Sequence, residues 1–278
     1  MAGVTDKSPG SGRGDGADRR AGVAVTAEGL GLDGPRGRVF GGISLDASAG
    51  SLIALEGPSG SGRTCLLLAL TGRMRTTAGH AVVGDHRLPG RLAAVRRISA
   101  LGAVPGVTDL EPALSVAEQL RERALLQRRF DGSLRSLLRP RRERTAAARA
   151  RLDAALASAG LDLDTLPKGP RTRIRDLERL EVLRLSVALA LTGAPRLLAV
   201  DDVDLKLSED ERAEAWALLR SIAEDGTTVL AVCSRAPEDA VVVRTRGEQA
   251  GQADAGGPTD DVTTKEEAAD ALAETGRA

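Results

Sequence analysis

GPSGSGRT, residues 57–64, is the stretch of this sequence that most restricts its fold. It fits the phosphate-loop (P-loop) pattern G-x-x-x-x-G-[KR]-[ST], with Arg63 where lysine is usual. An apolar run at residues 51–55 precedes it and a leucine-rich run at 64–72 follows, which predicts a strand, a glycine loop and a helix. Backbone N–H groups of such a loop cradle phosphate oxygens at the positive end of the helix. The predicted ATP-binding residues are Gly57, Pro58, Ser59, Gly60, Ser61, Gly62, Arg63, Thr64 and Cys65.

A second element, LLAVDD at residues 197–202, reads as a buried strand that ends in two carboxylates. An acid at the carboxyl end of such a strand lies where the ligand crevice of an open α/β sheet forms. We expect Asp201, together with the hydroxyl of Thr64, to hold Mg²⁺. Asp202 is the candidate catalytic residue, which would orient or deprotonate the attacking water.

Strand-like and helix-like stretches alternate along the chain, which predicts an α/β fold with a mostly parallel sheet. The middle, residues 115–190, looks almost wholly helical, with breaks expected at Gly132, at Pro140 and at residues 167–170. Ser115 with Glu118 forms a candidate capping box. The other expected elements are strands at residues 23–25, 42–45, 196–200 and 227–232 and a helix at 209–223. Residues 1–20 are expected to form a disordered arm and residues 245–278 an acidic disordered tail, with a short possible helix at 265–274.

The composition excludes several classes of protein. Aromatic residues make up 1% of the chain and its net charge is zero, so neither base stacking nor global charge favours a nucleic-acid partner. The two cysteines, Cys65 and Cys233, form no disulfide framework and are expected to be small buried hydrophobes. We find no signal-peptide pattern and no apolar run long enough to span a bilayer, which predicts a cytoplasmic protein.

Four further blocks, residues 67–88, 101–120, 190–220 and 226–240, match in order and spacing the ATP-binding subunits of ATP-binding cassette (ABC) transporters. The sequence resembles this family from residue 21 to about 244. The resemblance implies a P-loop NTPase core, a small antiparallel N-terminal β part and an inserted helical subdomain at about 107–186. It also implies ATP and Mg²⁺ as cofactors, and a homo- or heterodimer on the cytoplasmic face of the membrane. An integral-membrane subunit would dock at residues 106–117 and the basic helices of residues 121–151.

The sequence departs from the family at several motifs. Gly106 takes the place of the Q-loop glutamine, and Ser234 that of the switch histidine. Asp202 is one methylene shorter than the usual glutamate, and a base displaced by about 1 Å can cost on the order of 10²-fold in rate. Arg63 keeps the charge of lysine but not its shape, so we expect retained but altered phosphate binding. His80 and His86 fall outside these motifs and read as surface or turn residues.

The signature segment, LSGGQ in the family, is here the degenerate LERLE: Leu177, Glu178, Arg179, Leu180 and Glu181. It has no glycines and brings two carboxylates toward a polyanion, although Arg179 could offset them. The family's dimer places each ATP between the P-loop of one subunit and the signature of the other. A regular partner would therefore still leave a defect in both sites.

Two functions stay open on the sequence alone. One is an ABC-type ATP-binding subunit that couples ATP binding, with or without slow hydrolysis, to transport. The other is a pseudo-ATPase that acts as a regulatory or scaffolding module. A P-loop kinase or GTPase fits less well, because no guanine-reading NKxD motif is present. The aromatic that would stack on adenine has no clear counterpart, and Phe40 is expected to pack in the core.

Overall fold

The parallel sheet that the sequence predicts has five strands in the order β6-β7-β8-β3-β9. The computed structural model describes residues 21–35, 37–130 and 140–245, all within one unit of the chain. The sheet consists of β3 (Leu52–Glu56), β6 (Ser99–Leu101), β7 (Leu197–Val200), β8 (Thr228–Cys233) and β9 (Val241–Arg244). Every pair in it is parallel, which confirms the α/β expectation.

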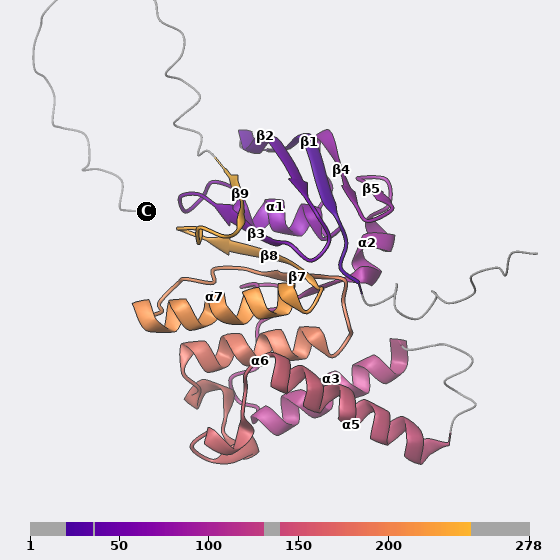
Figure 1. Cartoon of the computed structure of the whole chain (residues 1–278), viewed down its shortest axis with the longest axis vertical. Helices are drawn as coiled ribbons and strands as arrows, with labels where there is room; N and C mark the ends of the chain where they lie inside the picture. Colours follow the sequence, from indigo (N-terminus) through magenta and orange to yellow (C-terminus); the bar gives the residue numbers. More distant parts are fainter. Residues whose placement is uncertain (1–20, 36, 131–139, 246–278) are drawn as a thin grey trace, which may run out of the picture. The chain divides into compact units, whose positions relative to one another are not determined.

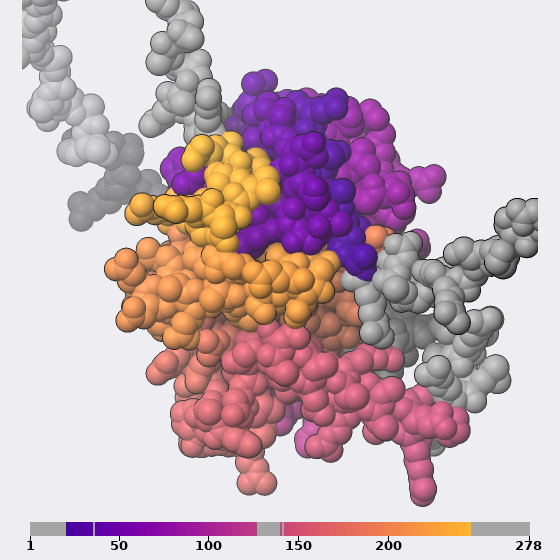
Figure 2. Space-filling view, viewed as in Figure 1, coloured from indigo at the N-terminus to yellow at the C-terminus, as the bar shows by residue number. Residues whose placement is uncertain are grey.

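A second, antiparallel sheet is built from the N-terminal part, in the order β2-β1-β4-β5. Its strands are β1 (Val25–Gly34), β2 (Gly37–Ala47), β4 (Ala78–Val83) and β5 (His86–Leu88). β1 and β2 are longer than the short strands expected, because they continue through irregular register past their apolar residues. This is the predicted antiparallel β part. Figure 2 shows the yellow β9 segment beside the indigo N-terminal residues.

Helices cover both faces of the parallel sheet (Figure 1). α1 (Arg63–Leu70) lies between the two sheets, and α6 (Arg179–Leu191) and α7 (Glu209–Glu224) cover the opposite face. α2 (Leu92–Ile98) packs against β5 and β6. Along β3, Ile53 and Leu55 join the core beneath α1, whereas Leu52 and Ala54 join the core with α6 and α7. This alternation follows from the two-residue period of a strand, and it buries β3 on both faces.

The helical part contains α3 (Val116–Phe130), α5 (Arg141–Ser158) and α6, with α3 and α5 both packed against α6. The Ser115–Glu118 capping box is confirmed: the Ser115 N–H donates to Glu118 Oε2 at 2.8 Å, and the Glu118 N–H to Ser115 Oγ at 3.3 Å. The helices are interrupted at residues 167–170 as expected, but the interruption between α5 and α6 is longer than the almost wholly helical pattern predicts. There the proline- and glycine-containing segment forms only short 3₁₀ helices, at Leu163–Thr165, Gly169–Arg171 and Ile174–Asp176.

The two chain ends that the sequence assigns to disordered segments, residues 1–20 and 246–278, lie outside the described residues. Thr245, the first residue of the expected tail, is itself ordered, and its N–H donates to the Glu56 carbonyl oxygen at 2.9 Å. Among the described residues, no helix has the length and apolar character that crossing a membrane requires.

Candidate functional site

The P-loop occupies the turn between β3, which ends at Glu56, and α1, which begins at Arg63. Gly62 adopts φ 82°, and a Cβ built there would lie 2.4 Å from the Val39 carbonyl oxygen. Ser61 is buried and its hydroxyl lies 2.6 Å from Thr245 Oγ1, which ties the loop to the end of β9. The expected strand, loop and helix are thus present, and Gly62 is required by both its φ and its close packing.

We expect Gly62→Ala to destabilise the fold by about 2–4 kcal/mol, since it adds left-handed backbone strain to a backbone clash. Gly60 provides a matched control. It has a similar φ of 79° but no heavy atom within 4 Å of a built Cβ, so Gly60→Ala should cost about 1 kcal/mol. Urea denaturation of both variants measures the difference. Equal losses would show that packing against β2 contributes nothing.

Thr64 and Asp201 meet directly. The Thr64 hydroxyl donates to Asp201 Oδ2 at 2.7 Å, and the Asp202 N–H donates to Asp201 Oδ1 at 2.9 Å. Asp201 follows the end of β7 and is 2% exposed. Burial raises the pKa of the Asp201 carboxyl, and the hydrogen bond from Thr64 opposes this shift. The structure therefore brings the two predicted magnesium ligands to one point, with hard oxygen donors of the type that Mg²⁺ prefers.

Arg63 is held against the end of β8. One guanidinium nitrogen donates to the Cys233 carbonyl oxygen at 2.5 Å, and another lies 4.0 Å from Asp202 Oδ1. The Arg63 side chain is 12% exposed and the Asp202 side chain 31%. Asp202 has φ 46°, a left-handed conformation that is uncommon for a non-glycine residue. Arg63 thus lies beside the phosphate loop, as the sequence predicts. It also contacts protein groups at the ends of two strands.

Ser234, the degenerate switch position, follows the last residue of β8. Its N–H donates to Asp204 Oδ2 at 2.8 Å, its hydroxyl also contacts that oxygen, and the Arg235 N–H donates to it at 3.3 Å. The Ser234 hydroxyl is therefore engaged by a carboxylate of the loop after β7. Unlike the histidine expected at this position, a serine cannot offer a positive charge to a ligand.

These residues surround one cavity of about 790 Å³. Its lining includes six residues of the predicted set, Gly57, Pro58, Ser59, Arg63, Asp202 and Ser234. Thr64 and Asp201 do not line it, although each is next in sequence to a lining residue. Five charged or polar residues that line the cavity were not predicted from the sequence. Only Glu56 could have been noticed, because it is a charged residue at the end of an apolar strand. These five residues are Glu56, Asp204, Lys206, Arg244 and Thr245.

The degenerate signature lies at the start of α6 and does not line this cavity. Glu178 is the N-cap, and Glu178 and Glu181 form a capping box in which the Glu178 N–H donates to Glu181 Oε2 at 2.8 Å. Leu180 is buried, and Arg179 donates to the Leu205 carbonyl oxygen at 3.4 Å. The carboxylates of LERLE therefore occupy N–H groups at this helix end that could otherwise bind an anion.

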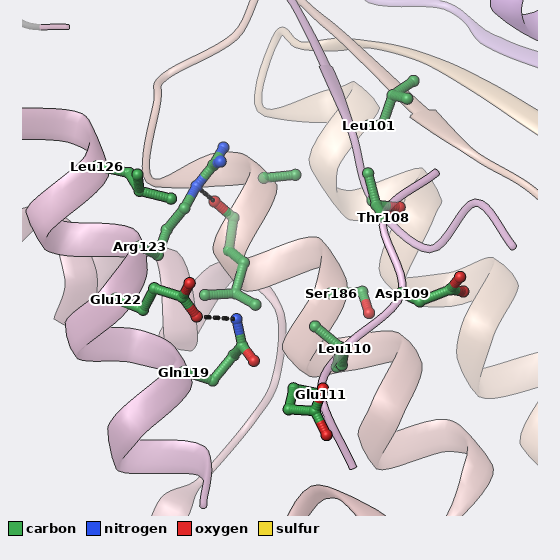
Figure 3. Close-up of a pocket in the computed structure, with 13 residues that line it drawn as sticks. Leu101, Thr108, Asp109, Leu110, Glu111, Gln119, Glu122, Arg123, Leu126 and Ser186 are labelled. Carbon is green, nitrogen blue, oxygen red and sulfur yellow. Dashed lines mark hydrogen bonds between the residues drawn. The ribbon is translucent and has the colours of Figure 1, made fainter. Parts of the chain in front are cut away.

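A second cavity, of about 310 Å³, lies where the segment after β6 faces α3 and α6. Figure 3 shows Gln119, Glu122, Arg123 and Leu126 on one face of α3, as their helical spacing requires. Gly106 lies in the same connection between β6 and α3. It adopts φ 75° and donates its N–H to Asp109 Oδ2 at 2.9 Å, but it lines neither cavity.

The remaining residues considered in the sequence analysis are Phe40, the two cysteines and the two histidines. Phe40 is buried, as expected, and so is Cys233, whose thiol has its pKa raised to about 12, mainly by burial. Cys65 is only half-buried, which corrects the expectation for it, because α1 turns this position partly toward the surface. His80 in β4 lies 3.6 Å from a Glu28 carboxylate oxygen and is partly exposed. His86 also lies in a strand, β5.

Comparison with known proteins identifies the family to which this architecture belongs. Residues 40–204 match the family model described as ABC transporter. The ribose import ATP-binding protein RbsA 1 of Rhizobium meliloti is 30% identical over 77% of this chain. The chain covers 40% of the length of that relative and 51% of another curated relative.

Solved structures agree with the fold. The cbiO1 protein of Clostridium perfringens, part of the ABC transporter complex cbiONQ, is 18% identical with a TM-score of 0.59, over 77% of this chain and 79% of that one. The dimeric ATP-binding cassette MJ0796 with ADP and Pi is 21% identical with a TM-score of 0.56, over 76% of this chain and 88% of that one. The chain belongs to the ABC transporter family and has the fold of its ATP-binding subunits.

Proposed function

We propose that this chain binds Mg-ATP in the 790 Å³ cavity and serves as the ATP-binding subunit of an ABC transporter. The observation that carries the proposal is the 2.7 Å hydrogen bond between Thr64 and Asp201, which joins the P-loop to the end of β7. A hydroxyl and a carboxylate oxygen so placed suit Mg²⁺, which usually takes one or two protein oxygens and completes its shell with phosphates and water. The loop amides and the N-terminus of α1 would bind the phosphates.

The ion, when bound, supplies positive charge that neutralises the phosphates. Thr64 and Asp201 would hold it, and the hydrogen bond from Arg63 to the Cys233 carbonyl oxygen joins the loop to the end of β8. Asp202 is the group that would orient or deprotonate the attacking water, because it is partly exposed in the same cavity. Its weak contact with Arg63, at 4.0 Å, leaves carboxylate lone pairs available to water.

Hydrolysis by this site is expected to be slow. The Ser234 hydroxyl is engaged by Asp204, and the α6 N-terminus is capped by Glu178 and Glu181. Both observations favour the second candidate function, a nucleotide-binding pseudo-ATPase that regulates or fills a subunit position. Binding of ATP is common to both functions, and phosphate release separates them.

Release of inorganic phosphate from Mg-ATP by the purified chain tests the enzymatic function. We expect a low rate that falls about 100-fold in Asp202→Asn, because the amide keeps the shape of the side chain and loses the base. Lys168→Ala, outside both cavities, is the control for a surface substitution and should match the unmodified protein. Saturable ATP binding without release above background would reject the ATPase and favour the pseudo-ATPase.

We further propose that an integral-membrane subunit docks on the cavity of Figure 3, and that the chain acts as a homo- or heterodimer at the cytoplasmic face of the membrane. The cavity combines apolar groups with an acidic rim of Asp109, Glu111 and Glu122. Gln119 Oε1 is buried there without a hydrogen-bond donor in the described part of the chain. Leu126 is 42% exposed beside it. An amphipathic segment that carries donors and an apolar anchor would satisfy all of these groups.

A further inference from the structure

The loop that follows β7 places a lysine at the phosphate cavity. Lys206 lines this cavity together with Arg63 and Ser234. Its side chain is exposed, and its ammonium group makes no hydrogen bond or ion pair with any residue of ranges 21–35, 37–130 and 140–245. A long, flexible lysine in this position can move toward a ligand without breaking an existing contact.

The other two cations of the cavity lining are already engaged. Arg244 donates to a Glu56 carboxylate oxygen at 3.0 Å. Arg63 donates to a backbone carbonyl and lies 4.0 Å from the Asp202 carboxylate. Lys206 is therefore the cation of the described lining that forms no ion pair with a carboxylate of the described residues, although Asp202 and Asp204 line the same cavity.

The backbone of this loop is strained where the lysine stands. Among the described non-glycine residues, only Ala194, Asp202 and Lys206 have positive φ, and the last two line this cavity. Lys206 has φ 59°, a conformation that glycine adopts without cost. Backbone strain of this kind occurs preferentially at functional sites, and glycine would suit the backbone at position 206 better than lysine does.

We propose that Lys206 contacts the terminal phosphate of a bound nucleoside triphosphate and makes the site prefer a triphosphate over a diphosphate. This inference rests on the proposed function, since it assumes a nucleotide in the cavity. If the loop amides hold the inner phosphates of the nucleotide, its terminal phosphate would lie in the space lined by Asp202, Ser234 and Lys206. The additional negative charge of a triphosphate needs a cation there, and the Lys206 ammonium is free to supply it.

Calorimetric titration of the full chain with the Mg²⁺ complexes of ADP and of the non-hydrolysable β,γ-imido analogue of ATP tests this role. Lys206→Ala should lower the affinity for the triphosphate analogue about tenfold, as expected for loss of one hydrogen bond between charged groups. The affinity for ADP should stay within twofold. Lys206→Arg should keep most of the preference, and Lys168→Ala, which removes an exposed lysine outside the cavity, should change neither affinity.

Lys206→Gly separates the charge from the backbone. It relieves the left-handed strain, so its melting temperature should rise while the triphosphate preference is lost as in Lys206→Ala. An unchanged ratio of the two affinities in Lys206→Ala, or an equal fall in both, would overturn the inference and leave the proposed function intact. Failure of the unmodified chain to bind either nucleotide would instead overturn the proposed function, and the inference with it.

Discussion

Thr64→Val is expected to reduce the affinity of the chain for Mg-ATP about 100-fold. Valine has the shape of threonine but lacks the hydroxyl, so the variant loses a magnesium ligand while the P-loop keeps its packing. It also leaves Asp201 Oδ2, which accepts the Thr64 hydrogen bond at 2.7 Å, without that donor in a buried position. The substitution should therefore also lower the free energy of unfolding, by about 1–3 kcal/mol. Calorimetry and urea denaturation measure the two effects on the same protein sample.

Thr64→Ser is the matched control, because it retains the hydroxyl and removes only a methyl group. It should bind Mg-ATP within a few-fold of the unmodified chain. The assignment of Thr64 as a magnesium ligand predicts a further difference: the loss of affinity in Thr64→Val should shrink when Mg²⁺ is chelated. A similar loss with and without Mg²⁺ would contradict that assignment.

Thr228→Val is expected to lower the free energy of unfolding by about 3 kcal/mol. Thr228 is fully buried, and its Oγ1 accepts from the N–H groups of Val23 and Gly50, both at 3.0 Å. The same hydroxyl donates to the Val23 carbonyl oxygen at 2.7 Å. Valine would leave two amides without an acceptor, and each such group costs about 1–3 kcal/mol. The melting temperature should fall by roughly 6–12 °C.

Thr228→Ser keeps the hydroxyl and is the control for this variant, with an expected loss of about 1 kcal/mol for the missing methyl group. The effect matters for the site because Thr228 starts β8, whose far end carries the carbonyl group that holds Arg63. A Thr228→Val protein as stable as Thr228→Ser would show that water replaces the lost hydrogen bonds.

The sequence was sufficient for features that depend on local chemistry. The P-loop between β3 and α1, and the meeting of Thr64 with Asp201, follow from two short motifs at the ends of buried strands. The Ser115–Glu118 capping box follows from residue spacing alone. The glycine loop and the capping box are determined within a few residues. The contact between Thr64 and Asp201 joins residues 137 apart, and it was predictable because the carboxyl ends of parallel strands meet at one edge of an α/β sheet.

Long-range contacts that no sequence motif marks were not predicted. Glu56 and Arg244 are 188 residues apart in the sequence, and only the pairing of β3 with β9 brings them together. The sequence did not single out Lys206, since neither its φ nor the cavity beside it is visible in the sequence. The sequence predicts a break in the helices at residues 167–170, but not that the whole segment between α5 and α6 forms only 3₁₀ turns.

The degenerate signature has a clearer physical meaning in the structure. The sequence predicts repulsion between the LERLE carboxylates and a phosphate, while the structure shows Glu178 and Glu181 engaged in capping α6. Their charge is therefore directed at the helix N–H groups, which lowers the capacity of this helix end to bind an anion. In a dimer of the family's type, the ATP held opposite this signature would lose that interaction.

Equilibrium binding of Mg-ATP to the purified full chain, followed by calorimetry, tests the central claim most directly. The proposed function predicts saturable binding of one nucleotide per chain that weakens when Mg²⁺ is chelated and is largely lost in Thr64→Val. Absence of saturable binding at millimolar nucleotide, by a chain that circular dichroism shows to be folded, would contradict it.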